Sequence, residues 1–220
     1  MNGFAFSLCG APLIALPSGA LWWSGARLLA VGDLHLGKSE RLARRGGAML
    51  PPYEVHETLT RLEADIAATD PGTVLCLGDS FDDLDAAAGL NACAVQELKG
   101  LMAGREWIWV AGNHDPGPTD LGGTHLAELH RGALVFRHIA VPGARGEVSG
   151  HYHPKARLGR VSRPAFLVDS ARVILPAYGT YTGGLHSDDR ALQGLMGKRA
   201  LAVLTGKAAT PIPMRRDGSR

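Results

Sequence analysis

Three largely apolar runs constrain the fold most, because each is followed within two residues by glycine and then by an acidic or amide side chain. The runs are Leu28–Val31, Thr73–Leu77 and Glu106–Val110. Uninterrupted apolar runs suit strands that are buried on both faces, as in a parallel sheet. Apolar residues at helical spacing over 53–68, and a helix-like stretch over Ala86–Met102, separate the runs. This β-α-β-α-β order predicts a largely parallel sheet flanked by helices.

Shorter β-like runs precede and follow this unit. We expect several strands before residue 31, and a later series with turns that ends in a strand over Ala200–Leu204. The later strands are expected over Ala133–Ile139, Glu147–Ser149, Arg157–Val161, Ala165–Val168 and Arg172–Leu175. Neither a repeat nor a clear linker divides the chain, so we predict one domain over residues 1–220, with a mobile polar tail over 211–220.

Composition fits a soluble globular protein of 220 residues. The formal net charge of +2 neither demands nor excludes a nucleic-acid partner, since a local basic patch is enough. The chain has three cysteines and no CxxC pair, which favours a reducing compartment over a disulfide framework. No secretory signal and no apolar stretch of membrane-spanning length stand out, so we expect a cytoplasmic protein without a membrane partner.

Five short segments carry the side chains that point to chemistry. They are Asp33-Leu34-His35, Gly78-Asp79-Ser80-Phe81-Asp82, Gly112-Asn113-His114-Asp115, His138 and Gly150-His151-Tyr152-His153. Taken singly, most of them are also explained by turns or helix caps. Taken together, they supply Asp, His and Asn side chains, which hold pairs of divalent metals. A pair of adjacent metals indicates hydrolysis of a phosphate ester.

The spacing within the segments suggests how they converge. Asp33 and His35 are two residues apart, as are His151 and His153, and on an extended segment such residues face the same way. Asp79 directly follows a buried strand. Its carboxylate could bridge two metals, and a helix N-cap is the alternative.

The ordered set resembles the calcineurin-like metallophosphoesterases, with the motifs DxH, GDxxD, GNHD, a distal His and GHxH over residues 33–153. The resemblance implies a four-layer α/β/β/α sandwich with two divalent metal ions. One ion would be held by Asp33, His35, Asp79 and His153. The other would be held by Asp79, Asn113, His138 and His151.

Two further stretches, Asp33–Ser39 and Leu175–Gly184, resemble the DNA-ligase-associated metallophosphoesterases of bacterial DNA-repair clusters. That resemblance implies a manganese-dependent phosphodiesterase that cuts single-stranded DNA, with a functional link to a DNA ligase and other repair proteins. The ligand types suit manganese, iron or zinc, and the sequence does not choose among them.

One position departs from the repair-type pattern. Related repair nucleases carry His three residues after the bridging Asp, whereas this chain has Asp82. We expect the Asp82 carboxylate to hydrogen-bond the ring of His114 and keep it charged, with His114 acting on the phosphoryl group. This pairing opens an alternative substrate class, nucleotides or other small phosphate esters. A non-catalytic binding module in a repair complex is a third reading, which the complete ligand set disfavours.

Substrate-binding residues are harder to assign. Arg41 and Arg45 would share one face of a helix, as a track for phosphates or as a solvated face. Tyr152, within the His pair, is a further candidate for substrate contact. Tyr178 and Tyr181 either stack on a base or pack within the protein.

Overall fold

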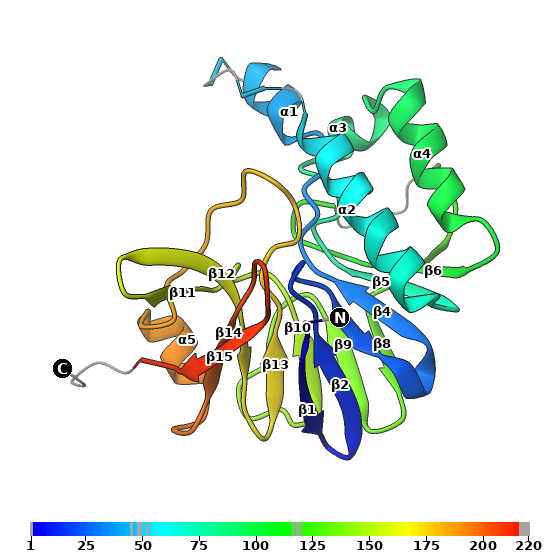
Figure 1. Ribbon diagram of the computed structural model, residues 1–220. Coiled ribbons are helices and arrows are strands. Elements are labelled where there is room, and N and C mark those ends of the chain that lie inside the picture. Colours follow the sequence, from blue (N-terminus) through cyan, green and yellow to red (C-terminus); the bar gives the residue numbers. More distant parts are fainter. Residues whose placement is uncertain are drawn as a thin grey trace.

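The computed structural model describes residues 2–44, 46–47, 50–51, 53–115, 117 and 120–215. Two mixed β-sheets lie face to face, and helices cover the outer face of each (Figure 1). Helices α2 (Glu54–Thr69) and α4 (Ala92–Met102) pack on the first sheet, and α5 (Arg190–Leu195) packs on the second. The predicted α/β/β/α sandwich is therefore confirmed.

The first sheet has the strand order β1-β2-β3-β4-β5-β6-β7. Its strands are β1 (Phe4–Leu8), β2 (Ala11–Ala15), β3 (Leu21–Trp23), β4 (Leu28–Val31), β5 (Thr73–Leu77), β6 (Glu106–Val110) and β7 (Thr124–Leu126). Strands β1 to β4 pair antiparallel, and β4 to β7 pair parallel, as the β-α-β-α-β order predicts. A short 3-10 helix, η1 (Ser24–Ala26), joins β3 to β4.

The second sheet has the order β15-β14-β12-β13-β10-β9-β8, and β11 pairs with β12 off this path. Its strands are β8 (Glu128–Arg131), β9 (Leu134–Arg137), β10 (Glu147–Ser149), β11 (Lys155–Leu158), β12 (Val161–Val168), β13 (Arg172–Ile174), β14 (Leu201–Leu204) and β15 (Thr210–Pro213). Strands β9, β10 and β13 are parallel neighbours. The carboxyl ends of β9 and β10 therefore lie at one edge.

Three apolar layers hold the sandwich together. The central layer lies between the sheets and includes Leu75, Phe136 and Phe166, all fully buried. Each such side chain contributes about 1.5–3 kcal/mol by leaving water. The helix layer buries one face of α2 through residues such as Leu59 and Leu62, spaced three apart as an amphipathic helix requires. The third layer lies between the second sheet and α5.

Three expectations about elements are wrong. The stretch over Ala86–Met102 is two helices, α3 (Leu84–Ala88) and α4, because the Asn91 side chain accepts from Ala94 N at 2.9 Å and starts a new helix. The single strand expected over Arg157–Val161 is instead divided by a turn at residues 159–160: Arg157 and Leu158 end β11, Gly159 has a φ of 61°, and Val161 begins β12. The tail does not begin at residue 211, since β15 pairs with β14; residues 216–220 lie outside the described residues.

No helix among the described residues is long and apolar enough to cross a membrane.

Candidate metal centre

All five motif segments meet at one edge of the sandwich, because each follows the carboxyl end of a strand that is parallel to another motif-bearing strand of its sheet. In the first sheet, β4, β5 and β6 are parallel and lead into the first three segments. In the second sheet, the parallel strands β9 and β10 lead into His138 and the His pair. This edge is the usual place for ligands in parallel sheets. The elements thus bring all seven predicted ligands and His114 into one region.

The backbone at this edge is left-handed where sequence reasoning expected extended chain. Asp33, His35, Asp79, His151 and His153 have φ values of 54°, 45°, 46°, 71° and 45°. Non-glycine residues adopt this region at a cost of about 1–3 kcal/mol each, and such residues concentrate at functional sites. The side chains of each pair therefore converge through local left-handed turns, and the expected sharing of one face of an extended segment is wrong.

Two motif glycines are required by close approach. A Cβ on Gly78, which has a φ of 79°, would lie 2.5 Å from Nδ1 of His138. A Cβ on Gly150 would collide with the Asp33 carboxylate. The glycines therefore let the strand ends of the two sheets approach until the ligand side chains touch.

The first cluster consists of Asp33, His35 and His153. Nε2 of His35 lies 3.4 Å from Nε2 of His153, and Nε2 of His153 lies 3.2 Å from Oδ1 of Asp33. One donor atom from each residue lies within 4.8 Å of the others. Asp33 is fully buried and also accepts the backbone N–H of His151 at 3.0 Å, which fixes the carboxylate.

The second cluster consists of Asp79, His138 and His151. Nε2 of His138 lies 3.3 Å from Oδ2 of Asp79 and 3.2 Å from Nδ1 of His151. The same Nε2 lies 2.9 Å from Oδ1 of Asn113, so the predicted amide ligand points at this cluster. Nδ1 of His138 also lies 3.8 Å from Oδ1 of Asp33, which places the two clusters side by side.

The donor set of the second cluster fits a cation. Nδ1 of His138 lies 2.8 Å from the Leu77 carbonyl oxygen, which has no proton to give, so this nitrogen carries the N–H. In neutral His138, the Nε2 lone pair then faces oxygens of Asp79 and Asn113, which are acceptors as well. Lone pairs converging from imidazole, carboxylate and amide are the environment that a divalent metal satisfies.

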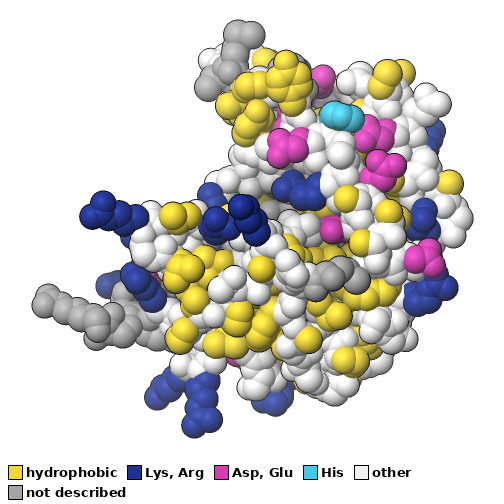
Figure 2. Space-filling model, in the orientation of Figure 1, with side chains coloured by type: hydrophobic (Ala, Val, Ile, Leu, Met, Phe, Trp, Pro, Cys, Tyr) yellow, Lys and Arg dark blue, Asp and Glu magenta, His cyan; other side chains and the backbone are white. Residues whose placement is uncertain are grey.

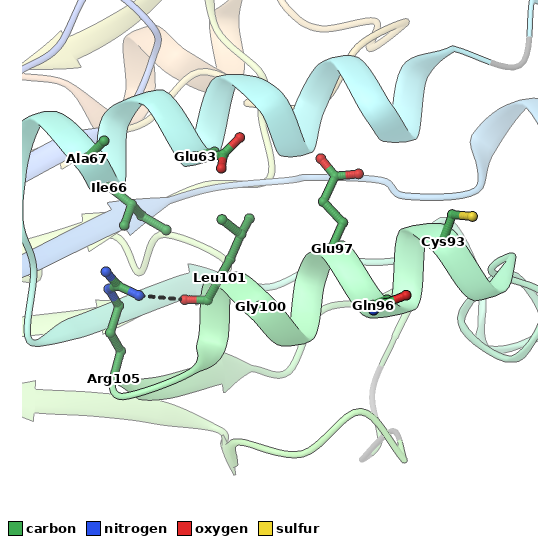
Figure 3. A pocket seen from close by; sticks show the side chains of 9 residues that line it. All are labelled: Glu63, Ile66, Ala67, Cys93, Gln96, Glu97, Gly100, Leu101 and Arg105. Atoms are coloured by element: carbon green, nitrogen blue, oxygen red, sulfur yellow. Dashed lines mark hydrogen bonds between the residues drawn. The ribbon is translucent and has the colours of Figure 1, made fainter.

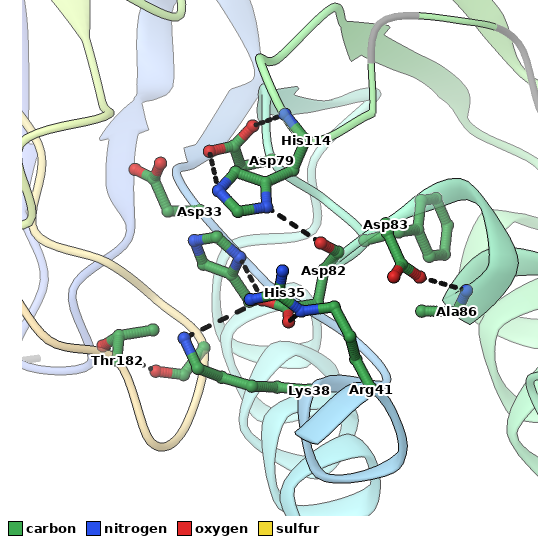
Figure 4. A network of polar contacts seen from close by, with 12 residues as sticks. Asp33, His35, Lys38, Arg41, Asp79, Asp82, Asp83, Ala86, His114 and Thr182 are labelled. Carbon is green, nitrogen blue, oxygen red and sulfur yellow. Dashed lines mark hydrogen bonds and ion pairs between the residues drawn. The ribbon is translucent and has the colours of Figure 1, made fainter. Parts of the chain in front are cut away.

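The first cluster fits a cation for a similar reason, and here the structure corrects the role given to Asp82. Oδ1 of Asp82 lies 2.9 Å from Nδ1 of His35 at ion-pair distance, so Nε2 is the His35 nitrogen that faces the cluster. Its other oxygen pairs with Nε of Arg41, and Nζ of Lys38 lies 3.8 Å from Oδ1 (Figure 4). Asp82 is thus a carboxylate behind a ligand histidine, an arrangement that orients metal-binding imidazoles.

His114 meets Asp82 only through the backbone. Nδ1 of His114 donates to the Asp82 carbonyl oxygen at 2.8 Å, so the expected contact with the Asp82 carboxylate is wrong. The other ring nitrogen, Nε2, lies 4.0 Å from Oδ2 of Asp79, and the side chain is 31% exposed. The backbone N–H of His114 also donates to Oδ1 of Asp79 at 2.8 Å. The ring therefore stands beside the second cluster and open to a substrate.

His35, Asp82 and His114 form a third group of potential donors within 4.8 Å. A metal is not needed there, because the Asp82 carboxylate already has the His35 N–H and the Arg41 guanidinium as partners. We assign this group to positioning.

The electrostatics of the second cluster reflect its carboxylates. Burial by itself would raise the pKa of Asp79, but the hydrogen bond and charge of His138 and the N–H of His114 outweigh burial and lower it. Burial would lower the pKa of His138, whereas Asp79 and Asp33 raise it. Burial and the neighbouring His138 lower the pKa of His151. The Asp79 carboxylate therefore stays ionised, as a metal ligand must be.

Sequence reasoning missed the role of Asp115. Its Oδ2 accepts the backbone N–H groups of Ser80 at 2.7 Å and Phe81 at 3.1 Å, which fixes the turn that carries Asp79. Its place in the Gly112–Asp115 motif was the available signal. No sequence motif indicated that Lys38 and Arg41 would lie beside the Asp82 carboxylate.

The residues predicted to contact substrate lie in different surroundings. Arg41 lies in α1 (Lys38–Arg44) and is paired with Asp82, and Arg45 lies outside the described residues. Tyr152 packs partly buried against the third apolar layer, with its ring centroid 5.0 Å from that of His151. Tyr178 is buried and donates to Asp65 at 2.8 Å, so it cannot stack on a base. Substrate contact by Arg41 or Tyr152 stays a prediction.

Of two hollows on the described surface, only one borders the edge that carries the metal-ligand clusters. One of about 630 Å³ lies between α2 and α4, where Arg105 is tied to the Leu101 carbonyl (Figure 3). None of the predicted site residues lines it. A smaller hollow of about 300 Å³ borders the second cluster through Asn113 and His138. Because the candidate metal-ligating atoms border the smaller hollow, we place the candidate catalytic site there.

Comparison with known proteins agrees with this geometry. The profile of the calcineurin-like phosphoesterase family matches residues 26–188. The crystal structure of Pseudomonas putida nuclease MPE is similar, with a TM-score of 0.78 and 27% identity, over 96% of this chain and all of that one. No curated protein matches the sequence.

The chain belongs to the calcineurin-like phosphoesterase family. Members of this family are metal-dependent hydrolases of phosphate esters, and this protein carries the Asp and His clusters suited to divalent metals. Its structural neighbour from Pseudomonas putida is a nuclease.

Proposed function

We propose that this protein is a manganese-dependent phosphodiesterase with two metal ions, which cuts single-stranded DNA internally during DNA repair. The observation that carries the proposal is the pair of adjoining clusters. Asp33 Oδ1 lies 3.2 Å from Nε2 of His153 in the first cluster and 3.8 Å from Nδ1 of His138 in the second. The nuclease neighbour supports the choice of nucleic acid, and the resemblance to ligase-associated enzymes supports repair and a functional link to a DNA ligase.

Bound divalent metals would supply Lewis-acid activation of water and of the phosphoryl oxygens. The first cluster and Asp79 would hold one ion, and the second cluster with Asn113 would hold the other. The protein's own groups orient these ligands: the Leu77 carbonyl fixes the ring of His138, and the Asp82 carboxylate fixes the ring of His35. The Asp82 carbonyl fixes the ring of His114, which is 31% exposed. When the ring carries a proton on both nitrogens, its Nε2 donates to a phosphoryl or leaving oxygen.

The small-ester alternative loses its specific support. It relied on the Asp82 carboxylate charging His114, and that carboxylate is engaged by His35 and Arg41 instead.

The decisive assay incubates the purified protein with manganese and circular single-stranded DNA, alongside bis(p-nitrophenyl) phosphate as a simple diester. We expect linear DNA and a coloured product, both abolished by EDTA and by Asp79→Ala. Intact circles beside a cleaved diester would instead favour small substrates. Bound metal without turnover of either substrate would favour the non-catalytic module.

A second variant tests the role of His114. His114→Ala should retain both metal ions and slow hydrolysis by about 10²–10⁴-fold, the usual contribution of a positioned proton donor. His56→Ala is the matched control, because that ring is 78% exposed on α2, far from both clusters in sequence. Loss of one ion in His114→Ala would show that His114 is a ligand.

A further inference from the structure

A basic hairpin extends from the metal centre. The segment 155–164, here called the arm, comprises β11, its turn and the first half of β12, and it starts two residues after His153. Every residue from Arg157 to Pro164 is exposed, whereas Ala165–Val168 is buried. Figure 1 shows this hairpin projecting from the side of the second sheet.

The arm is charged with one sign only. It contains four basic residues and no acidic one: Lys155, Arg157, Arg160 and Arg163. Taking these four from the 23 basic residues leaves 19 against 21 acidic ones, so the rest of the chain has no positive excess. Figure 2 shows Lys and Arg side chains gathered on the side of the molecule where Figure 1 places the arm.

These cations are not neutralised within the part of the chain that the structure describes. No ion pair to a carboxylate involves an arm residue there. Arg157 makes one long contact, 3.4 Å from its Nη2 to Nε2 of His186, and Arg163 donates to the Thr205 carbonyl at 3.3 Å. Their positive charge is therefore available to an anionic partner.

The arm is joined to a loop that borders the metal centre. Nζ of Lys155 donates to the Thr182 carbonyl at 3.2 Å, and N of Lys155 donates to the Leu185 carbonyl at 2.8 Å. In the same loop, Gly184 lies so close to His153 that a Cβ there would collide with the His153 carbonyl. The arm is thus linked through this loop to the backbone of His153.

Exposed apolar and aromatic side chains accompany the charges. Leu158 and Val161 pair across the turn and are 54% and 53% exposed. Tyr181, next to Thr182 in the loop, is 38% exposed. Cationic grooves with accessible aromatic rings suit unpaired bases on a phosphate chain, since bases stack on such rings only when they are not paired in a duplex.

We infer that the arm and Tyr181 form a binding track for single-stranded DNA that delivers the strand to the metal centre. The arginines contact phosphates, and Tyr181 stacks on a base. The inference rests on the proposed nuclease function and adds where the strand lies outside the metal centre.

The test measures equilibrium binding of a fluorescein-labelled oligothymidylate by anisotropy in EDTA, over a range of salt concentrations, so that no cleavage occurs. Each phosphate contact on a single strand adds about 0.7 to the slope of log affinity against log salt. The variant R157Q/R160Q should bind about tenfold more weakly at low salt, with a slope smaller by about 1.4. Its hydrolysis of bis(p-nitrophenyl) phosphate with manganese should be unchanged.

The matched control K99Q/R145Q removes the same charge from exposed positions elsewhere on the chain. It should leave affinity and slope unchanged. Equal losses in both double variants, or wild-type binding by R157Q/R160Q, would overturn the track. Tyr181→Ala should weaken single-strand binding at least about fivefold without changing the slope. A duplex bound as tightly as the single strand would overturn the single-strand assignment.

Failure of the track is distinguishable from failure of the proposed function. Wild-type protein that linearises circular DNA while R157Q/R160Q binds normally refutes the arm alone. If the wild-type protein cuts no DNA, but binds it with a salt dependence that R157Q/R160Q loses, the proposed nuclease function is refuted. The arm then remains a binding surface.

Discussion

Replacing Asp82 by Asn tests the assignment of its carboxylate to His35. Asp82 is fully buried, and its Oδ1 lies 2.9 Å from Nδ1 of His35. Hydrogen bonds to a charged group contribute about 1.5–3 kcal/mol and neutral ones about 0.5–1.5 kcal/mol, so the neutral amide loses about 1–2 kcal/mol at His35. That loss corresponds to roughly 5- to 30-fold weaker metal binding, which overlaps the range of about 10- to 100-fold typical of residues behind metal ligands.

The assay titrates metal-free Asp82→Asn with manganese and follows both bound metal and hydrolysis of bis(p-nitrophenyl) phosphate. We expect the affinity of one ion to fall about tenfold. Activity should return when more manganese is added, because the ligands themselves remain. Asp83→Asn is the matched control: Asp83 caps α3 by accepting from Ala86 N, and asparagine caps equally well. Unchanged metal affinity with lost turnover would refute this reasoning and return Asp82 to a role at His114.

Three further predictions concern a buried ion pair, a steric contact at a motif glycine and stabilisation by bound metal. Glu147→Ala leaves Arg172 buried without the partner that lies 3.0 Å away, and urea unfolding should show a loss of about 3–5 kcal/mol; a loss under about 1 kcal/mol would contradict the buried pair. Gly150→Ala places a methyl group against the Asp33 carboxylate and should lower metal content in a folded protein, unlike Gly194→Ala, where a Cβ meets nothing; equal metal content in both variants would refute the steric argument. Manganese at 100 times its dissociation constant should raise the free energy of unfolding by about 2.7 kcal/mol over the EDTA-treated protein. Calorimetry should find that increment reduced in Asp79→Ala, and an undiminished increment would place the metal elsewhere.

Much of the fold follows from local signals. The strands Thr73–Leu77, Glu106–Val110 and Glu147–Ser149 have the predicted bounds. In the first two, a largely apolar run that ends just before a glycine marks a buried strand. Strands β7 and β8 carry polar residues such as Thr124 and Glu128 and gave no such signal. They were therefore missed.

The sequence by itself determined which side chains gather at the metal centre. Each motif directly follows a strand end, and parallel strands place their carboxyl ends together, so order along the chain implies proximity in space. Only the tertiary structure decided the partners of those side chains. The Asp82 carboxylate pairs with Arg41, 41 residues away in the chain, and the ring of His114 contacts only the Asp82 backbone carbonyl; Tyr178 is buried against Asp65. The physical reason is that a buried charge takes the donor that packing brings to it, and packing between distant segments leaves no periodic mark in the sequence.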